Sequence, residues 1–136
     1  MKENSKISNI TIIGNTTWGQ AIATLINKEK AGVQILCRTE LEAKNRINKL
    51  DKLKSLPSTI QLSSDISTLG NSELIILAFP SQSMRSNLNI INNNLNQNHK
   101  FLIASKGIEK TSGKRLSEVL TEEITFIKEK NISILS

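Results

Sequence analysis

The segment "ELIILAFP", residues 73–80, is the most apolar run of the chain. Its apolar residues follow one another without the alternation of polar and apolar positions that a strand with one wet face shows. An uninterrupted apolar strand is buried on both faces, as parallel strands between two layers of helices are. The segment therefore predicts an inner strand of a mostly parallel sheet with helices on both sides.

Strand-like and helix-like patterns alternate along the rest of the chain. Strands are expected at residues 7–13, 33–37, 59–62, 100–105 and 132–136. A first helix is expected from the apolar face formed by Ala21, Ile22, Leu25 and Ile26, and a second from the capping box of Thr39 and Glu42, which Leu41, Ile47, Leu50 and Leu53 continue. One or two helical turns are expected at residues 63–70. Two more helices are expected, one carrying Met84, Leu88, Ile91 and Leu95 and one at residues 115–124. Because the connections are short, this order favours a Rossmann-type, doubly wound α/β fold with a mostly parallel sheet.

Four short stretches each follow a predicted strand, and they are the candidates for a binding site. Ligands of doubly wound sheets bind beyond the carboxyl ends of the strands. The stretches are residues 14–19, Arg38, residues 79–83 and residues 105–107. We expect them to line one crevice.

Length and charge limit the class of protein. With 136 residues and 38% hydrophobic residues, the chain is expected to form one domain over residues 1–136. The net charge of +6 favours anionic partners, and a phosphorylated metabolite or cofactor satisfies it as well as a nucleic acid does. A solvated basic surface that follows from the biased composition explains the charge more simply than either partner. Because the lysines are scattered and no basic run is interleaved with aromatic residues, we expect no nucleic acid.

Other single features bear on location and on metal binding. The lone cysteine, Cys37, indicates a reducing cytoplasm, and no apolar stretch is long enough to predict membrane insertion. His99 lies in a polar connection and is interpreted as a surface residue. The sequence has no paired His or Cys spacing, so no metal site is expected.

The stretch "IIGNTTWGQA", residues 12–21, carries most of a phosphate-binding loop. Gly14 permits a tight turn after the first strand, Gly19 permits close packing of the following helix, and the free N–H groups at the helix start attract an anion. Thr16 stands where the middle glycine belongs, and either it displaces the phosphates or its hydroxyl binds them, so weakened binding is expected. On the two glycines alone, a plain strand–turn–helix corner without a ligand is the simpler explanation.

The residue after the second predicted strand bears on the choice of nucleotide. An acid at this place holds the ribose of NAD, but this chain has Arg38 there. A guanidinium pairs with a 2′-phosphate and so favours NADP, although an exposed arginine at a strand end without a ligand explains it too. If the loop bends, Glu40 reaches the ribose, and NAD therefore stays an alternative cofactor.

Lys106, directly after a predicted strand and beside Gly107, is the candidate catalytic cation. Its ammonium would stabilise charge on a substrate oxygen in the crevice. Most lysines of this chain are expected to be solvated, so the argument rests on the position of Lys106 and not on its residue type.

Five segments together resemble one family, the bacterial NAD(P)-dependent glycerol-3-phosphate dehydrogenases, in their N-terminal half. They are "IIGNTTWGQAIA", "CRTE", "ILAFPSQSMRSNL", "ASKGIEKTSGKRLSEVL" and "ISILS", which match in order and spacing along nearly the whole chain. Gly14, Thr17, Trp18 and Gly19 coincide with the family's Gly-x-Gly-x-Trp-Gly pattern, from which Thr16 departs. The Trp18, Pro-Ser-Gln and Lys-Gly-Ile-Glu features argue against ketopantoate reductase and 6-phosphogluconate-type dehydrogenases.

The resemblance implies a function and a set of site residues. The reaction would be hydride transfer from NADPH or NADH to dihydroxyacetone phosphate, giving sn-glycerol 3-phosphate for phospholipid synthesis. The resemblance assigns cofactor contacts to Thr17, Trp18 and Arg38, and a contact with both nicotinamide and substrate to Lys106. Pro80 belongs to the segment that flanks the nicotinamide ribose, and Ser83 lies beside that segment.

The resemblance also implies a second part. In the family, the strand matching "ISILS" leads into a helical domain with a second catalytic lysine and the phosphate-binding residues, which this chain does not carry. We therefore expect a dinucleotide-binding domain truncated at its C-terminal end, completed by that domain or paired as a homodimer, with little turnover alone. The alternative is a noncatalytic dinucleotide-binding module or a decayed fragment.

Overall fold

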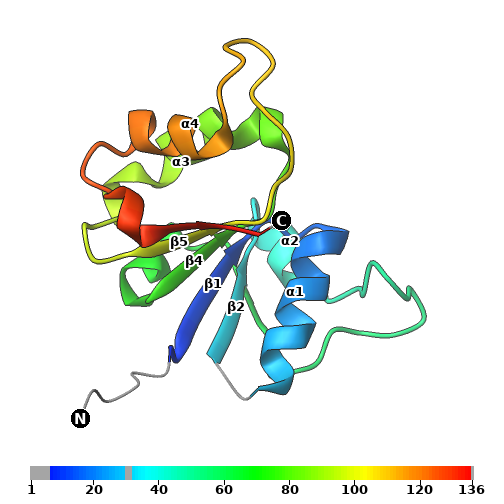
Figure 1. The fold of residues 1–136 in the computed structure, drawn as a ribbon. Coiled ribbons are helices and arrows are strands. Elements are labelled where there is room, and N and C mark those ends of the chain that lie inside the picture. The colour runs from blue at the N-terminus through cyan, green and yellow to red at the C-terminus, as the bar shows by residue number, and fades with distance from the viewer. Residues whose placement is uncertain (1–6, 30–31, 136) are drawn as a thin grey trace.

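The computed structural model describes residues 7–29 and 32–135, which form a parallel sheet between two layers of helices (Figure 1). The strand order is β3-β2-β1-β4-β5-β6, and every neighbouring pair is parallel. This is the order of the doubly wound dinucleotide-binding sheets. The expected fold class is confirmed.

The elements follow the predicted alternation. The strands are β1 (Asn9–Ile13), β2 (Gly32–Leu36), β3 (Gln61–Ser63), β4 (Leu74–Leu77), β5 (Lys100–Ile103) and β6 (Ile132–Ile134). The helices are α1 (Thr17–Lys28), α2 (Glu40–Lys44), α3 (Met84–Ile91) and α4 (Leu116–Glu123), with short 3-10 helices η1 (Ile66–Asn71), η2 (Ser81–Ser83), η3 (Asn92–Asn94) and η4 (Glu129–Asn131). Across the described ranges, no helix has the length and apolar character needed to cross a membrane.

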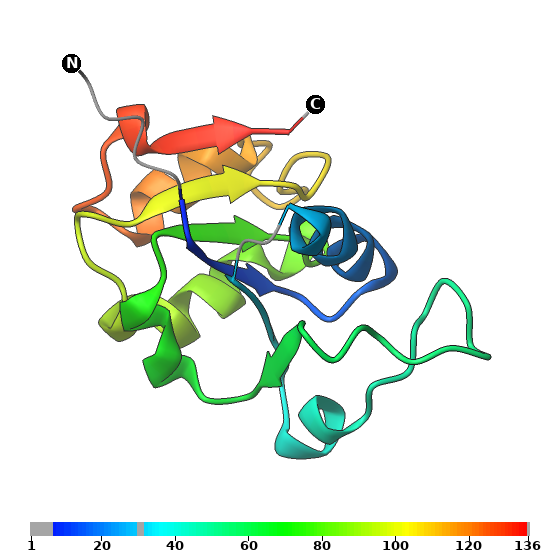
Figure 2. The same cartoon turned by 90° about the horizontal axis from the view of Figure 1, so that it is seen from below.

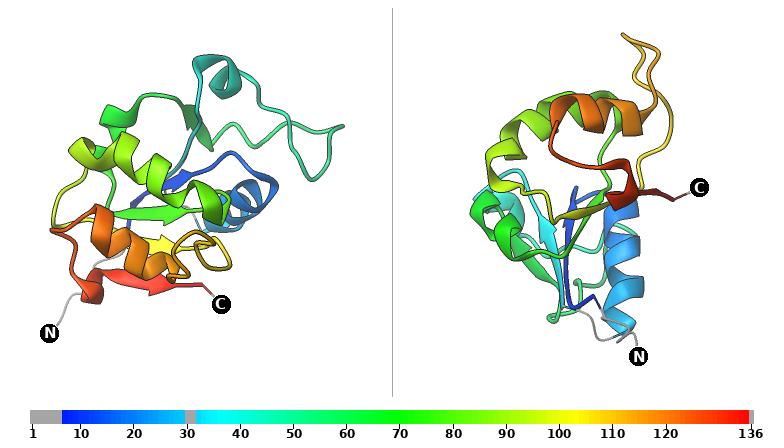
Figure 3. Two further views of the ribbon diagram at one scale, coloured as in Figure 1. Left: turned by 90° about the horizontal axis from the view of Figure 1, so that it is seen from above. Right: turned by 60° about the vertical axis from the view of Figure 1, so that its left-hand side comes forward.

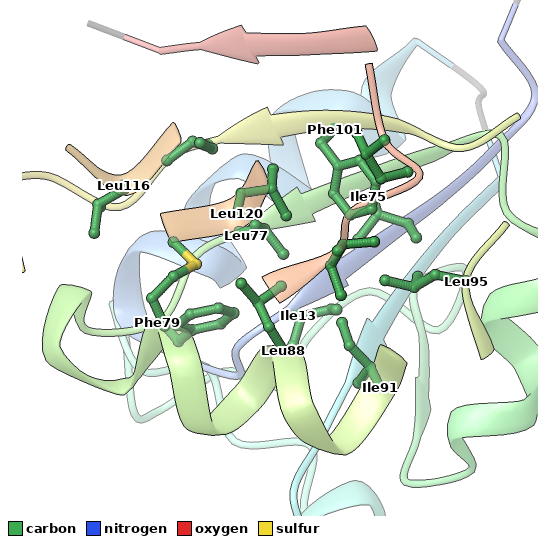
Figure 4. Packing of buried hydrophobic residues seen from close by; sticks show 14 of the residues in the cluster. Ile13, Ile75, Leu77, Phe79, Leu88, Ile91, Leu95, Phe101, Leu116 and Leu120 are labelled. Atoms are coloured by element: carbon green, nitrogen blue, oxygen red, sulfur yellow. The ribbon is translucent and has the colours of Figure 1, made fainter. Parts of the chain in front are cut away.

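The apolar run of β4 is buried because it packs on both sides of the sheet. Ile75 and Leu77 belong to the cluster under α3 and α4, which Figure 4 shows from close by. Ile76 and the following Ala78 belong to the cluster on the opposite face, against α1. Figure 3 shows α3 and α4 on one face and α1 on the other. The prediction of an inner strand from residues 73–80 is confirmed.

The prediction of a helix from Thr39 to Leu53 is wrong beyond the first turn. Thr39 caps α2 by accepting from the Glu42 N–H at 3.1 Å, but the helix ends at Lys44. Asn45 and Asn48 then accept from backbone N–H groups that follow them, at 2.9–3.2 Å, and such local bonds compete with helical ones. The apolar residues of the predicted face are therefore exposed, among them Leu41 at 81% and Leu53 at 98%.

Residues 45–56 form a hairpin-like excursion instead, which we call the 45–56 hairpin. Ile47 and Ser55 form an antiparallel bridge, and the Leu56 N–H donates to the Arg46 carbonyl at 2.9 Å. Leu56 is buried in the cluster beside α1 and anchors the end of the hairpin. Figure 2 shows this segment extending from the body beside β3.

Two further residues differ from their expected environment. Leu25 is 61% exposed, while Ala23 occupies the buried face of α1 beside Ile22. His99 is 2% exposed, so its assignment to the surface is wrong. Its ring bonds with the Leu69 carbonyl at 2.9 Å and accepts from the Asn96 N–H at 3.0 Å, which makes a polar ring acceptable in the core.

Candidate functional site

The carboxyl ends of the strands meet at one edge of the sheet, where two hollows lie side by side. The larger cavity, about 660 Å³, is lined by the predicted residues Gly14, Thr16, Arg38, Pro80 and Ser83. The smaller hollow, about 530 Å³, is lined by Thr16, Trp18, Pro80 and Lys106. Both include Thr16, Phe79 and Pro80, so they adjoin. Thr17 and Gly19 line neither.

The β1–α1 loop requires both of its glycines. Gly14 has φ +123°, and a Cβ there would lie 2.6 Å from the Ala78 carbonyl oxygen. A Cβ on Gly19 would lie 2.1 Å from the Gly14 carbonyl oxygen. The close approach at Gly19 is therefore to the backbone of the loop itself, and the two glycines allow the chain to turn sharply against the end of β4.

Thr16 uses its hydroxyl inside the protein. Oγ1 donates to the Ala78 carbonyl at 2.8 Å and accepts from the Gly19 N–H at 2.9 Å, which makes Thr16 the N-cap of α1. Its φ of −100° needs no glycine. Since the single hydroxyl hydrogen is engaged with Ala78, it is not available to bind a phosphate oxygen.

The start of α1 presents N–H groups to the rim. In the part of the chain that the structure describes, the N–H groups of Thr17 and Trp18 have no hydrogen-bond acceptor. The first turn of a helix offers such groups to anions, and the helix dipole adds a partial positive charge. The Trp18 ring is 46% exposed, and its Nε1 donates to the Ala104 carbonyl at 3.1 Å, across the smaller hollow's edge.

Arg38 lies two residues beyond the end of β2 and is exposed at the larger cavity. The acid beside it is Glu42, whose carboxylate accepts from the Arg38 N–H at 3.3 Å and which also lines the cavity. Glu40 instead pairs with Lys44 at 3.0 Å on the outer surface of α2. The acid that shares the cavity with Arg38 is thus Glu42, which lies two residues beyond Glu40, the residue that the sequence indicated.

Lys49 also lines the larger cavity, and sequence reasoning missed it. Its Nζ donates to the Asn15 carbonyl of the β1–α1 loop. The buried Gln20 bridges the same two segments, because Nε2 donates to Asn15 Oδ1 at 2.8 Å and Oε1 accepts from the Lys49 N–H at 2.8 Å. No local sequence pattern predicts the contact between Gln20 and Lys49, which are 29 positions apart.

The thiol of Cys37 lies in the wall of the larger cavity. Burial and the Glu42 carboxylate raise its pKa to about 11, against a lowering by the Lys49 ammonium. A thiol with this pKa is almost entirely protonated at neutral pH, so Cys37 is a packing residue and not a nucleophile.

The segment that carries Lys106 is held by the segment after β4. Gln82 Nε2 donates to the Ile108 carbonyl at 2.9 Å, and Gln82 Oε1 accepts from the Lys110 N–H at 3.0 Å. Ser105 Oγ donates to the Phe79 carbonyl at 2.5 Å. Lys106 is exposed at the rim of the smaller hollow, between these attachment points.

Arg85 ties the same two segments together on the side of α3. Its guanidinium meets the Glu109 carboxylate through three contacts of 2.8–3.0 Å and also bonds to Glu122 and Glu123 of α4 at 2.8 Å. The bonds from Arg85 and then from Ser112 hold the pKa of Glu109 below its usual range. The Pro-Ser-Gln-x-x-Arg and Lys-Gly-Ile-Glu stretches of the sequence therefore bind each other.

Comparison with known proteins decides the family. The model for the N-terminus of NAD-dependent glycerol-3-phosphate dehydrogenase matches residues 9–136. The chain belongs to this family. A glycerol-3-phosphate dehydrogenase [NAD(P)+] of Dehalococcoides mccartyi is 31% identical over 137 residues, which cover 96% of this chain and 38% of that protein. One of Neorickettsia sennetsu is 35% identical over 118 residues, covering 83% of this chain and 35% of that protein.

A solved structure agrees on the fold. The glycerol-3-phosphate dehydrogenase of Coxiella burnetii superimposes with a TM-score of 0.75 at 19% identity, covering 86% of this chain and 38% of that one. The chain thus corresponds to less than half the length of the relatives that it matches. The relatives are named as enzymes that use NAD(P)+, so the expected family and its nucleotide class are confirmed.

Proposed function

We propose that this chain binds NADP(H) or NAD(H) across the two adjoining hollows and that it is the nucleotide-binding part of a glycerol-3-phosphate dehydrogenase. One observation carries the proposal. The acceptor-free N–H groups at the start of α1 follow directly on Thr16, which lines both hollows. Cations stand at both hollows, Arg38 at the larger and Lys106 at the smaller. An elongated nucleotide with a diphosphate in its middle matches this distribution of positive charge.

The residues present fit such a nucleotide. The larger cavity, with Arg38, takes the adenosine half. The start of α1 at Thr17 and Trp18 takes the diphosphate. The smaller hollow, with Pro80 and Lys106, takes the nicotinamide half. Thr16 contributes by fixing the loop, because its hydroxyl is bound to Ala78 and Gly19.

The proposed reaction interconverts dihydroxyacetone phosphate and sn-glycerol 3-phosphate, a precursor of phospholipids, in the cytoplasm. The nicotinamide, when bound, supplies or accepts the hydride. Lys106 would bind the substrate oxygen and stabilise its developing charge, and Gln82 holds the backbone that presents it. Since the relatives extend well beyond the matched region, we propose that their remaining part completes the substrate site.

The second candidate is a nucleotide-binding module without turnover of its own, because the two hollows are both assigned to the halves of the nucleotide. Titration calorimetry with NADPH and NADH, followed by an assay with dihydroxyacetone phosphate, separates the two. Binding with turnover supports the enzyme, and binding without turnover supports the module. Absence of binding by both nucleotides contradicts the proposal in either form.

A further inference from the structure

The 45–56 hairpin places a second cation in the larger cavity, and its position is fixed from several sides. The Lys49 N–H and the Ile47 carbonyl both bond to the buried Gln20 of α1, at 2.8 and 3.2 Å. Arg46 fixes the base of the hairpin through Nη2, which donates to the Pro57 and Ile60 carbonyls at 2.7 and 2.6 Å. Lys49 is an exposed residue, but these bonds hold its backbone beside α1, where its side chain lines the cavity.

The Lys49 ammonium retains donors for a ligand. One of its three N–H donors goes to the Asn15 carbonyl. The Lys49 charge also acts on the Cys37 thiol at the end of β2, which is the strand that Arg38 follows. Lys49 and Arg38 therefore both stand at the β2 end of the cavity, where the sheet order places the adenosine ribose of a bound dinucleotide.

The charges of the side chains that line the cavity indicate a role for Lys49 in binding an anion. Glu42 lines the same cavity as Arg38 and carries the opposite charge. With Lys49 the three side chains sum to one positive charge, and without it they sum to zero. A phosphate monoester carries about 1.5 to 2 negative charges near pH 7, so a cavity whose lining side chains sum to zero charge would hold it weakly.

We infer that Lys49 is a phosphate-binding residue that works with Arg38 on the 2′-phosphate of NADP(H) and so makes the chain discriminate NADPH from NADH. This rests on the proposed function, in which the larger cavity holds the adenosine half. A charge-assisted bond from an ammonium to a phosphate is among the stronger hydrogen bonds, whereas NADH has only a hydroxyl at the same place. The hairpin is then a specificity element added to the nucleotide crevice.

The test compares NADPH and NADH binding by titration calorimetry in the full chain. Lys49→Met removes the charge and keeps most of the apolar stem, and Lys49→Arg keeps a charge. Lys52→Met, an exposed lysine of the same hairpin outside the cavity, controls for the loss of one positive charge. We expect Lys49→Met to lower NADPH affinity about tenfold, a value typical of a lost bond to a charged group, with less than about a twofold change for NADH.

Each remaining outcome decides the matter. Smaller losses in Lys49→Arg and Lys52→Met than in Lys49→Met support the inference. Equal losses for both nucleotides in Lys49→Met would place the ammonium at the diphosphate and overturn the inference. Unchanged NADPH affinity in Lys49→Met would overturn it too, as would a loss in Lys52→Met that equals the loss in Lys49→Met. If the unaltered chain binds neither nucleotide, the proposed function fails; if it binds both and Lys49→Met does not change their ratio, the inference alone fails.

Discussion

Trp18 Nε1 donates to the carbonyl oxygen of Ala104 at 3.1 Å, a bond between residues 86 positions apart. It joins the first turn of α1 to the residue that follows β5, two residues before Lys106. The bond thus sets the spacing between the proposed diphosphate site and the proposed catalytic cation. Had these lain at opposite ends of the sheet, a shared nucleotide would have been excluded.

Trp18→Phe tests this link by removing the indole N–H while keeping an aromatic ring. We expect the free energy of unfolding to fall by about 1 kcal/mol, the usual value of one hydrogen bond. Urea unfolding followed by circular dichroism measures it without the tryptophan signal. Leu25→Ala removes an exposed apolar group from the same helix and serves as the control. Equal stability of Trp18→Phe and the unaltered chain would show that the bond is not formed in solution.

Arg38→Ala is expected to weaken NADPH binding more than NADH binding, by about tenfold against about twofold, because the guanidinium would lose a charge-assisted bond to the 2′-phosphate. Calorimetry gives both affinities. If Arg38 and Lys49 bind the same phosphate, the double variant should lose less than the sum of the two single losses. Equal losses of affinity for both nucleotides in Arg38→Ala would show that the Arg38 guanidinium does not bind the 2′-phosphate.

Thr16→Val replaces the hydroxyl by a methyl group of similar size. We expect a loss of about 1 to 2 kcal/mol in the free energy of unfolding, since the helix cap to Gly19 and the bond to Ala78 both disappear. Thr16→Ser keeps the hydroxyl and should stay close to the unaltered chain. If Thr16→Val is as stable as Thr16→Ser, the hydroxyl of residue 16 does not stabilise the start of α1. Tighter NADPH binding by Thr16→Gly would show that the side chain obstructs the diphosphate.

The sheet could be predicted from sequence because its signals are local. The apolar run at 73–80 and the β-branched run before Gly14 each identify a strand without knowledge of its neighbours. Alternation with helices then leaves few topologies, and the observed strand order is the common one. The rim residues followed from the rule that ligands bind where parallel strands end.

The 45–56 hairpin could not be predicted in this way. Leu41, Ile47, Leu50 and Leu53 have spacings compatible with a helix, but the asparagines at 45 and 48 bind the backbone and end it. The place of Lys49 depends on Gln20, a contact between distant residues. His99 is polar and lies among polar neighbours, so nothing local indicates that its ring satisfies the Leu69 carbonyl in the core.

Lys106→Ala addresses catalysis and needs the substrate site complete. In a chain extended by the remaining part of a relative, we expect turnover of dihydroxyacetone phosphate to fall by about 10²- to 10³-fold, the usual cost of removing one group that stabilises a developing oxyanion. Lys110→Ala, an exposed lysine outside the hollow, is the matched control. Turnover that falls less than about threefold in Lys106→Ala would exclude a catalytic contact.

His99 makes stability depend on pH. Burial lowers its pKa below the usual 6.5, and its ring already accepts from the Asn96 N–H, so protonation would break that bond. Below pH 6.5 the unfolded chain takes up a proton that the folded chain resists. The stabilisation is therefore complete above the unfolded pKa and is lost as the pH falls towards the folded pKa, by up to about 1.4 kcal/mol per pH unit.

Urea unfolding at pH 7.5 and at pH 5.5 measures this loss, and His99→Gln isolates it. Glutamine keeps an amide that can bond to the Leu69 carbonyl, but it does not titrate in this range. We expect the variant to be less stable than the unaltered chain at the higher pH and to lose less stability on acidification. The carboxylates paired with Arg85 are common to both proteins, so their contribution cancels in the difference. The same acid loss in both would mean that His99 is not the group responsible.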